Sequence, residues 1–141
     1  MYIISNYFLA HVIEAIYDIA FRKGYEIILA VSQENSDREK KHLETMLSMR
    51  VDGILISVSE HTQNSDLFSE IKKRGVPLVF FDRTVNESEF SSVTSDNIDG
   101  AFKIIEYAIN KGYKKIGHIA GWGDSNIGRD RYAGFKKAMN K

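Results

Sequence analysis

The sequence predicts an α/β fold of three layers, in which a doubly wound parallel sheet is covered by helices on both faces. Short apolar segments recur without alternating with polar residues, which is typical of strands buried on both sides. Segments with apolar residues at helical spacing lie between them. One strand and one helix together take about 25 residues, as expected of repeated βαβ units with right-handed crossovers.

The predicted strands are too short for helices and are rich in β-branched and aromatic residues. They cover residues 27–31, 54–56, 78–81 and 116–120, and residues 1–4 resemble the end of another strand that is cut short. We predict the order 2-1-3-4 for the first four strands, counted along the chain. This order follows from unbroken strand–helix alternation.

Predicted helices occupy the segments around residues 12–20, 43–51, 67–71, 101–108 and 135–139. Gly24, Gly75 and Gly112 each follow cationic or amide residues, which suits a helix end with a left-handed cap. Ser36 and Glu39 have the spacing of a capping box. Asp96 and the next residue can begin the fourth helix by accepting its free N–H groups.

Composition excludes several classes of protein. The 141 residues contain 19 basic and 19 acidic side chains, so the chain lacks the positive charge of a nucleic-acid-binding surface. No cysteine is present, which excludes disulfides and zinc–thiolate sites and suits the cytoplasm. No stretch has the roughly 20 apolar residues of a membrane span, and no signal peptide is visible at the N-terminus.

Ligands of such sheets bind beyond the carboxyl ends of the strands, where several polar residues occur. Asp82 ends an apolar strand and could accept hydrogen bonds from ligand hydroxyls. Alternatively it caps a turn, whereas a phosphoacceptor role would need acidic residues after the first strand, which are absent. Ser57 and Ser59 could bond a ligand or lie in a solvated loop.

Aromatic and cationic candidates follow the other strands. Tyr7 and Phe8 could stack on a ring, although Phe8 could equally be a core residue. Trp122 could form an aromatic platform. Arg129, at the start of the last helix, is favoured for the ligand over Arg131, which is expected to be structural, because cations are unusual at that helix end.

No cofactor or metal is expected. The glycines at residues 121–128 lack the spacing of a dinucleotide fingerprint. The four histidines have no metal-ligand spacing on a common helix face, and no serine–histidine–acid set is recognisable. These observations argue against an enzyme.

Six segments, taken in order and spacing, resemble the effector domain of lactose/galactose-type repressors. They are residues 5–8, RVDGILI at 50–56, GVPLVFFDR at 75–83, residues 93–97, residues 111–116 and RDRYAGF at 129–135. The resemblance implies a truncated type I periplasmic-binding-protein-like fold. Residues 1–95 would form the first lobe, and residues 96–141 the crossover and first strand–helix unit of the second.

The resemblance also implies the function. A sugar or nucleobase-like effector would bind between the lobes, and Asp82, Arg83 and Arg129 would be among the residues that bind it. DNA would be bound through a helix-turn-helix domain absent from this chain. We expect a cytoplasmic homodimer, associated through helices 37–49 and 65–74, with no membrane contact. The alternatives are a periplasmic sugar-binding protein of a transporter, and a small flavodoxin-like or Rossmann-type enzyme.

Truncation suggests a further expectation. The strand at residues 78–81 would keep an unpaired edge, and such edges recruit other strands. We therefore expect residues 116–120 to pair beside it, within one chain or by exchange between two chains. The resulting partial cleft should bind effectors poorly.

Overall fold

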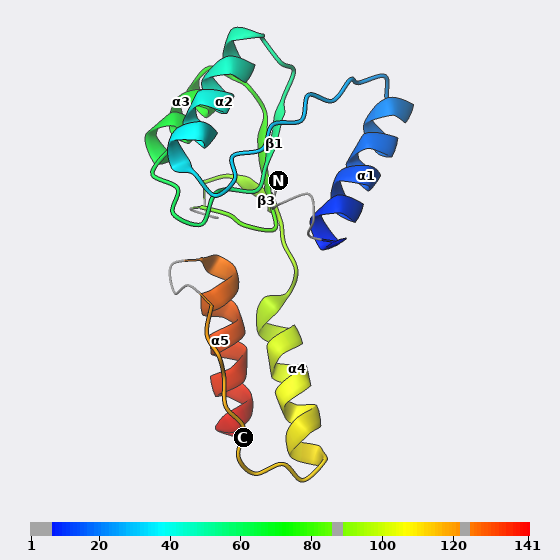
Figure 1. The fold of residues 1–141 in the computed structure, drawn as a ribbon, viewed down its shortest axis with the longest axis vertical. Helices are drawn as coiled ribbons and strands as arrows, with labels where there is room; N and C mark the ends of the chain where they lie inside the picture. The colour runs from blue at the N-terminus through cyan, green and yellow to red at the C-terminus, as the bar shows by residue number, and fades with distance from the viewer. Residues whose placement is uncertain (1–6, 86–88, 122–124) are drawn as a thin grey trace.

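The computed structural model describes residues 7–85, 89–121 and 125–141. Helices α2 and α3 lie on one side of the strands and α1 on the other, while α4 and α5 pack side by side below them (Figure 1). The α/β class and the positions of the helices are therefore confirmed. In chain order the elements are α1 (Tyr7–Arg22), α2 (Ser36–Ser48), β1 (Ile54–Ile56), α3 (Ser65–Lys73), β2 (Leu78–Phe81), β3 (Ser91–Val93), α4 (Asn97–Asn110) and α5 (Asn126–Met139).

The described strands form one parallel sheet in the order β1-β2-β3. Ile54 is opposite Leu78, as expected if the third and fourth predicted strands are neighbours. On the other edge of β2, Val79 is opposite Ser91. The predicted strand at residues 1–4, and with it most of the order 2-1-3-4, lies outside the described residues.

Residues 27–31 were predicted to form a strand, but the structure assigns none there. Leu29 and Val31 of this segment line a cavity together with Ile54 and Ile56 of β1. In the predicted order 2-1-3-4 the neighbour of residues 27–31 is the strand at residues 1–4, which lies outside the described residues. Among the described residues, no strand pairs with β1 on this side.

The prediction that residues 116–120 pair beside β2 is wrong. That edge is occupied by β3, whose sequence Ser-Ser-Val carries no apolar run and was not predicted as a strand. Residues 116–120 contain no strand. The His118 ring instead stacks on Phe135 of α5, with ring centroids 5.0 Å apart, and Ile119 is 99% exposed.

The core lies between the sheet and the helices α2 and α3. Phe68 of α3 and Phe80 of β2 are fully buried and meet edge to face, with ring centroids 5.3 Å apart. Phe90 contacts Phe80 in a similar geometry. The remaining buried members of this cluster are Leu43, Ile54, Val58, Ile71 and Leu78. This core anchors the carboxyl ends of β1 and β2.

Helix ends agree with the sequence at most positions. Gly24, Gly75 and Gly112 have φ values of 78°, 76° and 89°, the left-handed conformation expected of a cap glycine. The Asp96 side chain accepts the N–H of Asp99 at the start of α4, as predicted. The predicted capping box of Ser36 and Glu39 is wrong. Asn35 is the N-cap of α2 and accepts the N–H of Arg38, whereas the Glu39 side chain turns into the protein.

Candidate functional site

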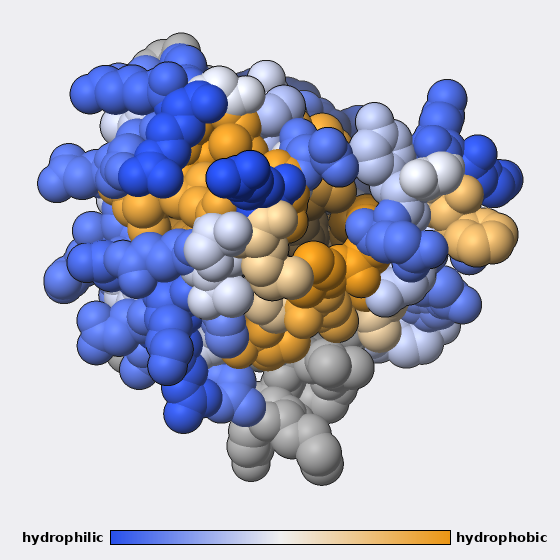
Figure 2. Space-filling view, turned by 90° about the horizontal axis from the view of Figure 1, so that it is seen from above, coloured by the Kyte–Doolittle hydropathy of each residue, from blue (hydrophilic) through white to orange (hydrophobic). Residues whose placement is uncertain are grey.

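A cavity of about 200 Å³ opens beside the carboxyl ends of β1 and β2. Its apolar walls come from α1, the segment at 29–31, α2 and β1. From above, apolar residues gather in the middle of the face and the surface is hollowed between polar flanks (Figure 2). The apolar lining includes Leu9, Ile13, Leu29, Val31, Leu43, Met46, Ile54, Ile56, Val58 and Phe81.

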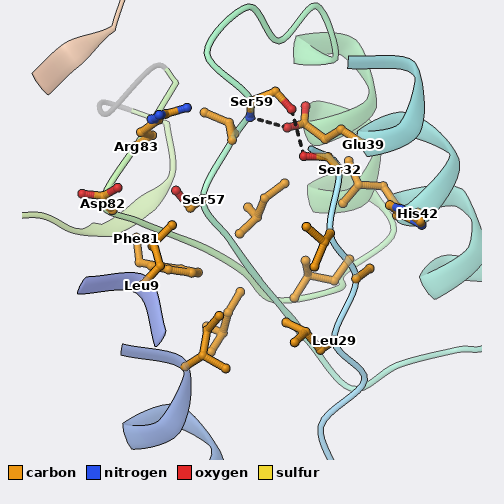
Figure 3. Close-up of a pocket in the computed structure, with 18 of the residues that line it drawn as sticks. Leu9, Leu29, Ser32, Glu39, His42, Ser57, Ser59, Phe81, Asp82 and Arg83 are labelled. Atoms are coloured by element: carbon orange, nitrogen blue, oxygen red, sulfur yellow. Dashed lines mark hydrogen bonds between the residues drawn. The ribbon is translucent and has the colours of Figure 1, made fainter. Parts of the chain in front are cut away.

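Polar side chains gather at one end of this cavity. Ser57 and Ser59 follow β1, and Asp82 and Arg83 follow β2 (Figure 3). They meet because the carboxyl ends of parallel strands lie at the same edge of a sheet. Ser32 joins them, with its hydroxyl 3.2 Å from that of Ser59. A polar rim beside an apolar wall suits a small ligand that carries hydroxyl groups on a hydrophobic ring.

Asp82 directly follows β2 and has a left-handed backbone conformation, with φ of 61°. Burial raises the pKa of its carboxyl group above the ordinary value of 3.8, and the nearby charges of Arg83 and Arg131 partly oppose this shift. A half-buried carboxylate of this kind is costly to leave without donors. Ligand hydroxyl groups would supply such donors.

Arg83 is tied to the segment that follows residues 27–31. Its guanidinium group lies 2.8 Å from Glu34, and Glu34 also accepts the backbone N–H of Glu60 at 2.9 Å. Gln33 and Glu34 have positive φ values of 55° and 58°. Three loops, which follow residues 27–31, β1 and β2, are thereby joined at the polar end of the cavity.

Asn126, at the start of α5, is 5% exposed and bonds the loop after β2. Its side-chain oxygen accepts the N–H of Thr84 at 3.3 Å, and its NH₂ group donates to the carbonyl oxygen of Asp82 at 3.4 Å. Arg131 donates from Nε to Asn97 at 3.0 Å. These bonds connect the end of β2 with the helical pair α4 and α5.

Of the residues predicted to bind a ligand, four line the cavity: Ser57, Ser59, Asp82 and Arg83. Tyr7, Phe8 and Arg129 do not line it. Tyr7 is 80% exposed and meets His11 ring to edge, Phe8 is half exposed, and Arg129 is exposed on α5. Trp122 lies outside the described residues. Ligand roles for all eight residues stay predictions.

Sequence reasoning missed five polar residues at the site: Ser32, Glu34, Glu39, His42 and Asn126. Ser32 and Glu34 directly follow an apolar segment, so the rule that selected Ser57 and Asp82 could have found them. Glu39 stands four positions before Leu43 on the apolar face of α2, where a charged residue is unusual. Asn126 has no comparable signal in the sequence.

In the part of the chain that the structure describes, no three His, Asp or Glu side chains come together to hold a metal ion. Within the same ranges, no helix has both the length and the apolar character needed to cross a membrane.

Comparison with known proteins places this geometry in a family. The family model for the periplasmic binding protein domain matches residues 1–141, so the chain belongs to that family. The HTH-type transcriptional repressor PurR of Pasteurella multocida is 35% identical over 95% of the chain. The chain spans 40% of that relative's length.

Two solved structures share the fold closely. A periplasmic binding protein/LacI transcriptional regulator from Alkaliphilus metalliredigens, complexed with D-xylulofuranose, is 30% identical with a TM-score of 0.84 over 97% of this chain and 49% of its own. The transcription regulator CcpA of Lactococcus lactis is 28% identical with a TM-score of 0.86, over 99% and 51%. The expected relationship to lactose-type repressors and the periplasmic-binding-protein-like fold are confirmed.

Proposed function

We propose that this chain is part of the effector-sensing domain of a bacterial transcriptional repressor. The observation that carries the proposal is the cluster of Ser57, Ser59, Asp82 and Arg83 at one end of an apolar cavity. The relatives at about one-third identity are repressors, and one related regulator has D-xylulofuranose bound. The ligand class is a sugar or a nucleobase-like compound.

In this proposal the chain binds and does not catalyse. Residues 1–95 form the first lobe, and residues 96–141 form the crossover and the first unit of the second. The effector binds between the lobes, with Asp82 accepting hydrogen bonds and Arg83 donating them. Operator DNA is bound through a helix-turn-helix domain outside these 141 residues, and the whole repressor works in the cytoplasm as a homodimer.

The dimer would use α2 and α3, which lie on the same side of the sheet (Figure 1). Met49, at the end of α2, is 55% exposed and offers an adaptable apolar contact. Met46 packs against the core. Met49 is therefore the better candidate for the interface. Light scattering of the whole repressor at high concentration tests this, and a monomer would argue against it.

The proposal is tested in the whole protein, with fluorescence anisotropy on DNA from its own promoter. D-ribose, D-xylulose, fructose 1-phosphate and adenine are the probes. We expect one of them to change DNA affinity, and we expect Asp82→Asn to reduce this response while DNA affinity without effector stays the same. Sugar binding without any DNA binding, together with a signal peptide upstream, would favour the periplasmic alternative.

A further inference from the structure

Glu39 is the most deeply buried carboxyl group that the proposed binding role leaves unexplained. It lies in the first turn of α2, is 4% exposed, and points toward the loop after β1 (Figure 3). Residues 57–64 make up this loop, which begins with the candidate ligand residues Ser57 and Ser59.

Three donors of the loop converge on the carboxylate. The backbone N–H of Ser59 donates to one oxygen at 2.5 Å. The hydroxyl of Thr62 and the side-chain NH₂ of Asn64 donate to the other, Asn64 at 2.9 Å. A carboxylate that accepts several hydrogen bonds in a buried setting holds its donors firmly, because each donor would otherwise be left without a partner.

The start of α2 adds further bonds to the same loop. The Ser36 hydroxyl accepts the N–H of Gln63 at 3.0 Å, and the Ser36 carbonyl accepts from Asn64 at 2.9 Å. The conformation of the loop is therefore held by hydrogen bonds to the start of α2. Within the loop, Ser59 is 3% exposed, and its hydroxyl lies 3.2 Å from the Ser32 hydroxyl at the cavity.

We propose that Glu39 is a positioning residue, which holds residues 57–64 so that Ser57 and Ser59 present their polar groups to an effector in the cavity. This inference rests on the proposed effector-binding function. Glu39 does not have to touch the effector, because its two oxygens are already engaged by donors from the loop.

Glu39→Gln is the sharpest test, because it keeps the shape and replaces one acceptor oxygen with an NH₂ group. The Ser59 N–H and the Asn64 NH₂ bond different oxygens of Glu39, so one of them would then face a donor. Turning the Asn64 amide over would cost its bond to the Ser36 carbonyl. The glutamine variant therefore cannot satisfy the loop.

The readout is hydrogen exchange by mass spectrometry on the whole protein, with peptides covering residues 57–64. We expect Glu39→Gln to speed exchange there about tenfold or more, while peptides covering β2 and α3 stay within experimental error. Glu44→Gln removes a carboxylate from the exposed side of the same helix and should change nothing. Unchanged exchange at residues 57–64 in Glu39→Gln would overturn the proposal.

A second pair of variants covers the case in which Glu39→Gln does not fold. Thr62→Val removes one donor to Glu39 with almost no change of shape, whereas Thr62→Ser keeps the hydroxyl group. We expect faster exchange of the loop in the valine variant and nearly normal exchange in the serine variant. Equal exchange in the two variants would contradict the proposed role of the carboxylate.

The link to ligand binding is measured separately by calorimetry with D-ribose, D-xylulose, fructose 1-phosphate and adenine. For any probe that the wild type binds, Glu39→Gln should weaken affinity by about tenfold, and Glu44→Gln should not. Unchanged affinity in Glu39→Gln would overturn the positioning role. Failure of the wild type to bind any probe would count against the proposed function, while the exchange result would still decide whether Glu39 holds the loop.

Discussion

One guanidinium nitrogen of Arg83 lies 2.8 Å from both carboxylate oxygens of Glu34, a residue 49 positions earlier in the chain. The pair joins the loop after β2 to the segment after residues 27–31 at the polar end of the cavity. Both side chains keep contact with solvent, at 28% and 44% exposure. The pair therefore orients Arg83 more than it stabilises the fold.

Glu34→Gln is expected to lower the free energy of unfolding by no more than about 1 kcal/mol, as for other exposed ion pairs. Effector affinity should fall more strongly, because Arg83 loses the carboxylate that orients it. Urea denaturation and calorimetry measure the two effects. Glu70→Gln breaks the comparable exposed pair with Arg74 on α3 and should leave affinity unchanged. Equal affinity losses in both variants would refute the orienting role.

Asp82 gives the protein a pH-dependent stability of predictable sign. Because burial raises its pKa in the folded state, the folded protein holds this proton more tightly than the unfolded chain. The stability contribution is fully present below the unfolded pKa of about 3.8 and is lost as pH rises through the folded pKa. At pH 7 the ionised carboxylate therefore carries a penalty.

Asp82→Asn should remove this penalty and raise the melting temperature at pH 7, while the difference from wild type shrinks as pH falls toward 3.8. Asparagine tolerates the φ of 61° at this position, so the backbone does not obscure the result. Thermal melts across pH provide the measurement.

Asp82→Ala should weaken effector binding by about 1–3 kcal/mol, measured by calorimetry, and unchanged affinity would remove Asp82 from the site.

Gly134 lets α4 and α5 pack closely. A Cβ atom there would collide with the carbonyl oxygen of Ile98 and would lie 2.8 Å from the Cβ of Ala101. We expect Gly134→Ala to destabilise the protein by about 1–3 kcal/mol in urea denaturation. Gly100→Ala is the matched control on α4, where nothing lies within 4 Å of the added atom. It should stabilise the protein by about 0.5–1 kcal/mol. Destabilisation by both alanines would show that packing is not the cause.

Asn126 couples the loop after β2 to α5, so its removal should loosen that connection. Asn126→Ala removes two hydrogen bonds: the one that the Thr84 N–H donates to Asn126, and the one that Asn126 donates to the Asp82 carbonyl. The expected cost is about 1–3 kcal/mol of unfolding free energy, because the asparagine is buried. Asn140→Ala, at the exposed end of α5, should cost far less. A similar loss at both positions in urea denaturation would speak against the coupling.

The sequence by itself determined the local structure and where polar residues meet. The periodicity of apolar residues identified all five helices of the described chain and the strands β1 and β2, because burial of one helical face or of a whole strand leaves a repeating pattern. Strand ends located Ser57, Ser59, Asp82 and Arg83, since parallel strands bring their carboxyl ends to one edge.

Only the tertiary structure decided which segments pair and which polar groups are buried together. The segment Ser91–Val93, with no apolar run, forms β3 because the edge of β2 offers it backbone hydrogen bonds, which side chains do not encode. Residues 116–120, although apolar, remain outside the sheet. Glu39 turns inward because donors from a loop twenty or more residues away converge on its carboxylate. Such long-range hydrogen bonds have no periodic signature in a sequence.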